Sequence, residues 1–153
     1  RIARLVDSKL SNGLPAMLIP HEVHAGLNSG LMIPHYTAAS LVLENQTLAT
    51  PDSIHSLPTS ANQEDHNANS MTAARHTWTI LQNCRQVLSI ELFSALTGVD
   101  LRLAMTNGNL GEGTRRIYQD LRKVIPKTNA DEIWTSSIDK INKLLKAHNL
   151  QTE

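Results

Sequence analysis

GLNSGLMIPHYTAASLVLENQTLAT, residues 26–50, is the stretch that decides the class of fold. Its apolar residues are distributed all round a helical wheel, and Glu44 carries its only formal charge. A helix that is apolar on nearly every side is a buried helix. Polar residues such as Asn45 interrupt the apolar run, so the stretch does not have the continuous length that a bilayer requires. We therefore predict a buried helix over about Ser29–Ala49, which begins or bends at Pro34.

The sequence around this helix is also poor in charge. No Lys or Arg occurs between Lys9 and Arg75, and the only carboxylates of residues 10–63 belong to Glu22, Glu44 and Asp52. Globular surfaces normally intersperse Lys, Arg, Asp and Glu. We therefore expect other protein to cover this part of the chain on most sides. Most of the fourteen basic residues follow Met71, which indicates a solvated C-terminal end.

Capping and spacing patterns predict three more helices. Ser60-x-x-Gln63 matches a capping box, and apolar residues at helical spacing continue to Gly98, a residue type that commonly ends helices. These features predict a long helix over about Asn62–Thr97. A shorter helix is predicted over Gly111–Ile125, and Asn129 is expected to cap a last amphipathic helix. The sequence thus predicts an all-α fold, built as a bundle of long helices.

Composition argues against several classes of function. Fourteen basic residues balance fourteen acidic ones, so no net charge attracts nucleic acid or an anionic membrane. Aromatic residues, which stack on bases, make up only 3% of the chain. Cys84 is the single cysteine, which excludes an intrachain disulfide and agrees with a reducing compartment. Its apolar neighbours predict a buried packing role for Cys84.

Two further patterns are weaker candidates for chemistry. His21-Glu22-Val23-His24 is one residue short of the H-E-x-x-H zinc motif, whose mechanism requires two histidines four positions apart. We expect a polar turn there and no metal site. Ser40 lacks the G-x-S-x-G context of a nucleophilic serine.

The most polar stretch is SANQEDHNANS, residues 60–70, which has two carboxylates and no Lys or Arg. In the first turn of the predicted long helix, Glu64 and Asp65 would complement the helix dipole and need no other function. However, the preceding sequence is nearly free of charge, where an ionised carboxylate needs a partner or a ligand. On these residues alone, both interpretations stay open.

Five segments together resemble the aromatic amino acid ammonia-lyase family. They are GLNSGLMI (26–33), TAASLVLEN (37–45), SLPTSANQEDH (56–66), LSIEL (88–92) and GVDLR (98–102). The likeness extends over essentially the whole chain and is most similar to the C-terminal part of the histidine ammonia-lyases.

Members of this family are much longer than this chain, and they form the electrophile 4-methylideneimidazole-5-one (MIO) from their own Ala-Ser-Gly. No Ala-Ser-Gly occurs here. The resemblance therefore implies the C-terminal part of a larger, all-α, tetrameric lyase in the cytoplasm. Residues 1–103 would belong to its central bundle and active site, and residues 104–153 would form a helical tail. The implied partners are the N-terminal part that carries MIO, further copies of the subunit and an amino acid substrate.

The implied reaction eliminates ammonia from histidine, or from a related aromatic amino acid, to give an α,β-unsaturated acid. Glu64 falls on the position that is Glu in histidine-specific members and usually Gln in phenylalanine and tyrosine lyases. The resemblance thus implies that Glu64 and Gln63 bind substrate and that Asp65 and His66 orient Glu64. Apart from a possible role of Glu64, no catalytic residue is implied in this chain.

Two segments depart from the family pattern beside the implied site. Asn67-Ala-Asn-Ser70 replaces an apolar residue followed by Ser-Met-Gly, and Pro34-His35-Tyr36 replaces a more usual Ala-Gln pair and its neighbour. These departures leave two alternatives open. The chain would then belong to an aromatic amino acid aminomutase, or be a non-catalytic helical assembly partner of a split lyase.

Overall fold

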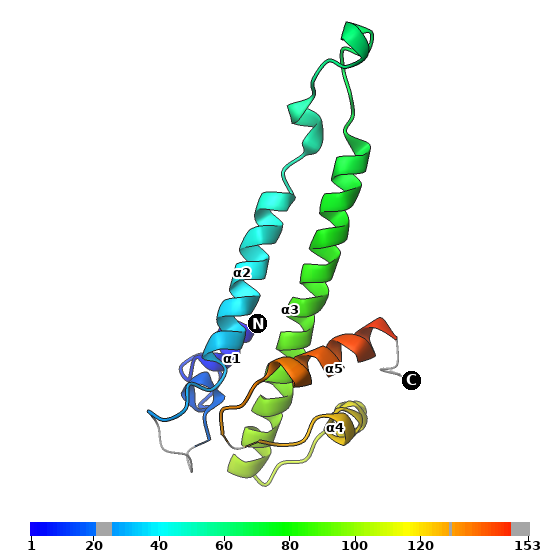
Figure 1. The fold of residues 1–153 in the computed structure, drawn as a ribbon. Coiled ribbons are helices and arrows are strands. Elements are labelled where there is room, and N and C mark those ends of the chain that lie inside the picture. Colours follow the sequence, from blue (N-terminus) through cyan, green and yellow to red (C-terminus); the bar gives the residue numbers. More distant parts are fainter. Residues whose placement is uncertain (21–25, 129, 148–153) are drawn as a thin grey trace.

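The computed structural model describes residues 1–20, 26–128 and 130–147, and among these residues it contains helices and no strand (Figure 1). The α-helices are α1 (Ile2–Val6), α2 (Met32–Leu48), α3 (Ser70–Met105), α4 (Glu112–Val124) and α5 (Thr135–Lys146). Three short 3-10 turns complete the described structure: η1 (Ala16–Leu18), η2 (Asp52–His55) and η3 (Ser60–Asn62). The prediction of an all-α fold is confirmed.

Helix α3 is the axis of the structure. Helix α2 lies antiparallel along its first half, and α1 and α5 pack against its second half (Figure 1). Residues 49–69 join α2 to α3 and form a tip at the end of the pair that is remote from α4 and α5 (Figure 1). This tip contains the polar stretch that the sequence marked as a candidate site.

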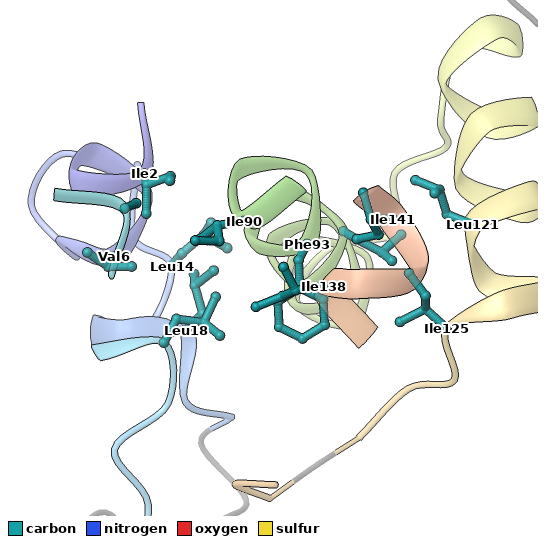
Figure 2. Close-up of a cluster of buried hydrophobic side chains, with 13 residues drawn as sticks. Ile2, Val6, Leu14, Leu18, Ile90, Phe93, Leu121, Ile125, Ile138 and Ile141 are labelled. Atoms are coloured by element: carbon teal, nitrogen blue, oxygen red, sulfur yellow. The ribbon is translucent and has the colours of Figure 1, made fainter. Parts of the chain in front are cut away.

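The hydrophobic core surrounds the second half of α3. Ile90 and Phe93 of α3 are 1% and 3% exposed, and the Phe93 ring lies 5.4 Å from that of Trp134. Figure 2 shows side chains from α1 and the loop after it on one side of α3, and side chains from α4 and α5 on the other. No residue between Ala49 and Leu88 is buried. The tip is therefore held by its connections to the helices rather than by a core of its own.

Helices α2 and α4 follow the sequence patterns closely, and α5 does not. Helix α2 starts three residues later and ends one residue earlier than predicted, with Pro34 buried in its first turn, where a missing N–H costs nothing. Helix α4 matches the predicted Gly111–Ile125 to within one residue at each end. The start predicted for the last helix is wrong: α5 begins at Thr135, because Asp131 is bound to the loop before α2 and residues 130–134 are not helical. Asn129, the predicted cap, lies outside the described residues.

The predicted bounds of the long helix are wrong at both ends. It begins at Ser70 instead of Asn62, because Ser60, Ala61 and Asn62 have φ of 53°, 53° and 67° and cannot continue into a helix. It also runs past Gly98, which is buried inside α3 instead of ending it. A Cβ on Gly98 would lie 3.1 Å from the Leu5 side chain, so this glycine serves the packing of α1 on α3.

The buried environment predicted for α2 is not supplied by this chain. Pro34 and Ala38 are its buried residues, whereas Tyr36 is 70% exposed and Leu43 is 63% exposed. Exposed apolar side chains continue along the first half of α3, where Trp78 is 66% exposed. Large apolar side chains exposed on both helices favour contact with other protein.

A polar cluster fixes α4 against the end of α3. Asp100 accepts hydrogen bonds from the Tyr118 hydroxyl at 2.5 Å and from the Arg122 guanidinium, and the Lys127 ammonium lies 3.2 Å away. Desolvation lowers the pKa of Lys127, but the hydrogen bond and the Coulombic attraction of Asp100 outweigh it and raise the pKa above 10.5. Lys127 is therefore charged at neutral pH.

Asp131 connects the α4–α5 loop to the loop before α2. Its carboxylate accepts the backbone N–H of Ser29 at 2.5 Å and of Gly30 at 3.0 Å, and its own N–H donates to Asn28 Oδ1 at 2.8 Å. Gly30 has φ +56°, and a Cβ there would lie 2.4 Å from the Met17 carbonyl oxygen. The loop therefore requires glycine at position 30.

We expect Gly30→Ala to lower the free energy of unfolding by about 2 to 4 kcal/mol, the sum of left-handed strain and a backbone clash. Gly13→Ala is the matched control, because Gly13 also has a positive φ but has nothing within 4 Å of its Cβ position. The control should lose only the strain contribution, about 1 to 2 kcal/mol. Urea unfolding of the intact protein, followed by circular dichroism, measures both. Equal losses in the two variants would contradict the contact with Met17.

Candidate functional site

The four predicted site residues lie together at the tip formed by residues 49–69. Gln63, Glu64, Asp65 and His66 follow η3 directly, and all four are exposed in this chain. They precede α3, which begins at Ser70. The interpretation of Glu64 and Asp65 as first-turn acids of the long helix is therefore wrong, because no helix dipole acts on them there.

A closed turn determines where Glu64 lies. The backbone N–H of Thr59 donates to the Glu64 carbonyl oxygen at 2.9 Å, and the Glu64 N–H donates back to Thr59 at 3.3 Å. The Thr59 hydroxyl also donates to Oε2 of Glu64 at 3.3 Å. Both the backbone and the carboxylate of Glu64 are thus tied to one residue.

The turn between Thr59 and Glu64 is strained. Ser60, Ala61 and Asn62 are left-handed in succession, and none of them is glycine. For residues with a side chain this conformation costs roughly 1 to 2 kcal/mol each. Such strain persists only where the surrounding contacts determine it, and it clusters at functional sites. Asn69 is also left-handed in the tip, but only this turn has three such residues in succession among the described residues of the tip.

Asp52 fixes the base of the tip through one contact with α3 and one with Asn69, the residue before α3. His76 Nδ1 lies 3.2 Å from Oδ2 of Asp52, and the Asn69 side chain donates to the Asp52 carbonyl oxygen at 3.0 Å. Across the tip, the Asn67 N–H donates to the Ser56 hydroxyl at 2.7 Å. The base of the tip is therefore fixed on α3, and its outer end is fixed by the turn that carries Glu64.

The Glu64 carboxylate is available for a ligand. Among the residues that the structure describes, no Lys, Arg or His nitrogen lies within ion-pair distance of it. An exposed, unpaired carboxylate accepts hydrogen bonds from cationic and N–H groups. The tip thus presents a fixed acceptor for a positively charged or N–H-bearing molecule.

Comparison with known proteins decides the family. The family model described as aromatic amino acid lyase matches residues 1–123, which include the whole tip. The chain belongs to the aromatic amino acid lyase family. The resemblance seen in the five sequence segments is therefore confirmed, and an all-α fold is what this lyase family leads us to expect.

Individual relatives of this lyase chain are enzymes of the same family. A histidine ammonia-lyase of Geobacillus thermodenitrificans is 47% identical over 146 residues, 95% of this chain and 28% of the relative. The histidine ammonia-lyase structure from Trypanosoma cruzi superposes with a TM-score of 0.86 at 36% identity, covering 97% of this chain and 28% of that one. A phenylalanine aminomutase of Pantoea agglomerans gives 0.83 at 33% identity, covering 94% and 27%. The lyase chain spans little more than a quarter of these relatives' length.

The cavities described in this lyase chain lie away from the tip. One of about 380 Å³ is lined by residues of α2, α3 and α5, among them Pro34, Ile90 and Ile138. Neither it nor the two other described cavities includes residues 63–66. Residues 63–66 are exposed in this chain, so a closed site around Glu64 would need walls from other protein.

The remaining candidates of the lyase chain have different outcomes. Cys84 is exposed and accepts a weak hydrogen bond from the Asn45 side chain at 3.5 Å, so the predicted buried role is wrong. The reason is that Cys84 precedes the part of α3 that the core surrounds. His21–His24 lies outside the described residues. Among the described residues, no group of three His, Cys, Asp or Glu side chains is arranged to hold a metal ion, and no helix has the length and apolarity to cross a membrane.

Sequence reasoning did not identify Thr59 as a site residue. The sequence Thr-Ser-Ala-Asn has no glycine to indicate left-handed backbone, and Ser60-x-x-Gln63 satisfies a helix-capping pattern instead. In the structure the Gln63 N–H donates to the backbone oxygen of Ser60 at 3.1 Å, which closes a turn rather than a helix.

Proposed function

We propose that this chain is part of an enzyme that eliminates ammonia from histidine and leaves an α,β-unsaturated acid. The observation that carries the proposal is the Glu64 carboxylate, held by the Thr59 turn at an exposed tip without a cationic partner among the described residues. The identity of 47% to a histidine ammonia-lyase supports the same substrate.

The proposed role of Glu64 is to bind the substrate. A carboxylate accepts a charge-assisted hydrogen bond from an imidazole N–H or an ammonium group. Phenylalanine carries the same ammonium group but has no N–H on its ring, so a carboxylate that binds the imidazole favours histidine over phenylalanine. Gln63, next to it, would bind the same substrate through its amide. Among the described contacts, neither Asp65 nor His66 is hydrogen-bonded to Glu64. Their proposed role, to orient Glu64, would therefore begin when the site is closed.

The family's electrophile, MIO, is not supplied by these residues. The 153 residues contain no Ala-Ser-Gly. Asn28-Ser29-Gly30 has a structural role instead, because the N–H groups of Ser29 and Gly30 donate to the Asp131 carboxylate. The residues present therefore do not fit the formation of this group. We propose that it comes from the N-terminal part of the enzyme.

The exposed apolar faces of α2 and α3 support assembly with that part and with further copies in a tetramer. On α2 they include Ile33, Tyr36 and Leu43, and on α3 they include Trp78, Leu81 and Leu88. Large exposed apolar surfaces of this kind are covered in functional proteins. Residues 1–103 would then contribute to the central bundle and the active site, and residues 104–153 would form the tail.

A second candidate function is that of an aromatic amino acid aminomutase. It is favoured by the likeness to the phenylalanine aminomutase of Pantoea agglomerans and by the departure of residues 67–70 from the pattern of histidine-specific lyases. A non-catalytic assembly partner is the third.

Product analysis of the complete enzyme distinguishes the three. Incubated separately with histidine, phenylalanine and tyrosine, the enzyme should release ammonia and an unsaturated acid from histidine, with little turnover of the other two. The ultraviolet absorbance of the conjugated acid and mass spectrometry of the products measure this. A β-amino acid product would identify an aminomutase. Absence of turnover with all three would favour the assembly partner and contradict the proposal.

A further inference from the structure

The Thr59 hydroxyl has a specific relation to the Glu64 carboxylate. It donates to Oε2 at 3.3 Å, and among the described hydrogen bonds this is the one that the carboxylate receives. The two backbone hydrogen bonds of the Thr59 and Glu64 bridge set the separation of the two side chains. The backbone bridge thus determines where the Thr59 hydroxyl lies relative to Glu64.

The carboxylate would otherwise be free to adopt several conformations. Glu64 is exposed, and an exposed glutamate loses considerable rotamer freedom when it is fixed in one position. A group that is already fixed binds its ligand without losing that freedom at the moment of binding. Three consecutive left-handed residues bring Thr59 and Glu64 together, so the strain of the turn produces this contact.

We propose that Thr59 is a positioning residue, which holds the Glu64 carboxylate in the orientation that meets the substrate. The proposal rests on the proposed role of Glu64. Thr59 has φ −129° and ψ 177°, an extended conformation that valine adopts equally well. Thr59→Val therefore removes the hydroxyl while the backbone bridge and the turn stay in place.

In the complete enzyme, Thr59→Val should lower kcat/KM for histidine by about 3- to 10-fold, the effect of one hydrogen bond to a charged group at an accessible site. Thr59→Ser restores the hydroxyl and should recover most of that loss. Thr106→Val is the matched control, since the Thr106 hydroxyl donates to Arg102 at 2.9 Å, at the other end of α3. Thermal unfolding of each variant, with Thr59→Ala as a second hydroxyl-free variant, reports any loss of folding.

The deciding measurement repeats Thr59→Val in a Glu64→Ala enzyme, which has no carboxylate to position. The additional loss should then fall below about twofold. If it stays at its full size, or if serine fails to restore activity, Thr59 acts through something other than Glu64 and the proposal is wrong. If Thr59→Val leaves kcat/KM for histidine unchanged while Glu64→Ala lowers it, the positioning role is wrong and the proposed function of Glu64 stands. Full activity of Glu64→Ala overturns both.

Discussion

Glu64→Gln in the complete enzyme is expected to lower the rate of ammonia release from histidine by roughly 30-fold to 1000-fold. A charge-assisted hydrogen bond inside a closed site contributes about 2 to 4 kcal/mol, and each 1.36 kcal/mol corresponds to a factor of about ten. Glutamine keeps the size of the side chain and an oxygen that accepts the Thr59 hydroxyl, so the loss reports the charge rather than the packing. Glu64 is exposed in this chain, so the proposed function requires the rest of the enzyme to close the site.

Steady-state turnover with histidine measures the effect. Glu112→Gln is the matched control, because Glu112 forms an exposed ion pair with Arg116 on α4, at the opposite end of the structure from the tip. Such a pair contributes little, and the control should keep nearly full activity. If Glu64→Gln turns over histidine within about threefold of the parent, a loss below about 1 kcal/mol, Glu64 does not bind the substrate.

The sequence predicted helix bounds well where the helix-end signals and the apolar spacing agree. Helix α4 was predicted to within one residue at each end, because its glycine, its apolar spacing and the following proline all indicate the same bounds. The charge-poor stretch was predicted to be covered by protein, and the structure leaves the apolar face of α2 exposed in this chain. The sequence thus predicted cover for a surface that this chain leaves exposed, without showing what would cover it.

The bounds of α3 could not be predicted because local patterns compete there. Ser60 and Gln63 satisfy both a capping box and a six-residue turn, and the bridge from Thr59 to Glu64 decides between them. Gly98 suits a helix end, but it is also the residue that lets Leu5 pack against α3. In both places the deciding contact comes from outside the local pattern. The candidate residues at positions 63–66 were found through the family resemblance, whereas Thr59 required the structure.

Arg122 of α4 contacts both α3 and the residues that follow α4. Of the substitutions considered, its loss is expected to lower stability the most. Its guanidinium donates to Asp100 and to the Leu96 carbonyl oxygen of α3 at 3.2 Å, and also to the Ile125 and Pro126 carbonyl oxygens at 3.1 and 3.2 Å. The Arg122 and Asp100 side chains are only 14% and 17% exposed. Removing one partner of a largely buried ion pair leaves the other charge without its main partner, which costs about 3 to 5 kcal/mol.

Arg122→Met should therefore open α4 locally, and hydrogen exchange of its backbone amides in the complete enzyme should accelerate by roughly 100- to 5000-fold, the factor that 3 to 5 kcal/mol implies. Arg122→Lys should recover only part of this, since one ammonium group cannot reach Asp100 and all three carbonyl oxygens together. Lys123→Met is the matched control on the same helix, where the exposed pair of Lys123 with Asp120 contributes about 0.5 kcal/mol or less. Adding Asp100→Asn to Arg122→Met should slow exchange again, because it removes the charge left without its main partner. Equal exchange in the Arg122 and Lys123 variants would show that the cluster does not hold α4 on α3.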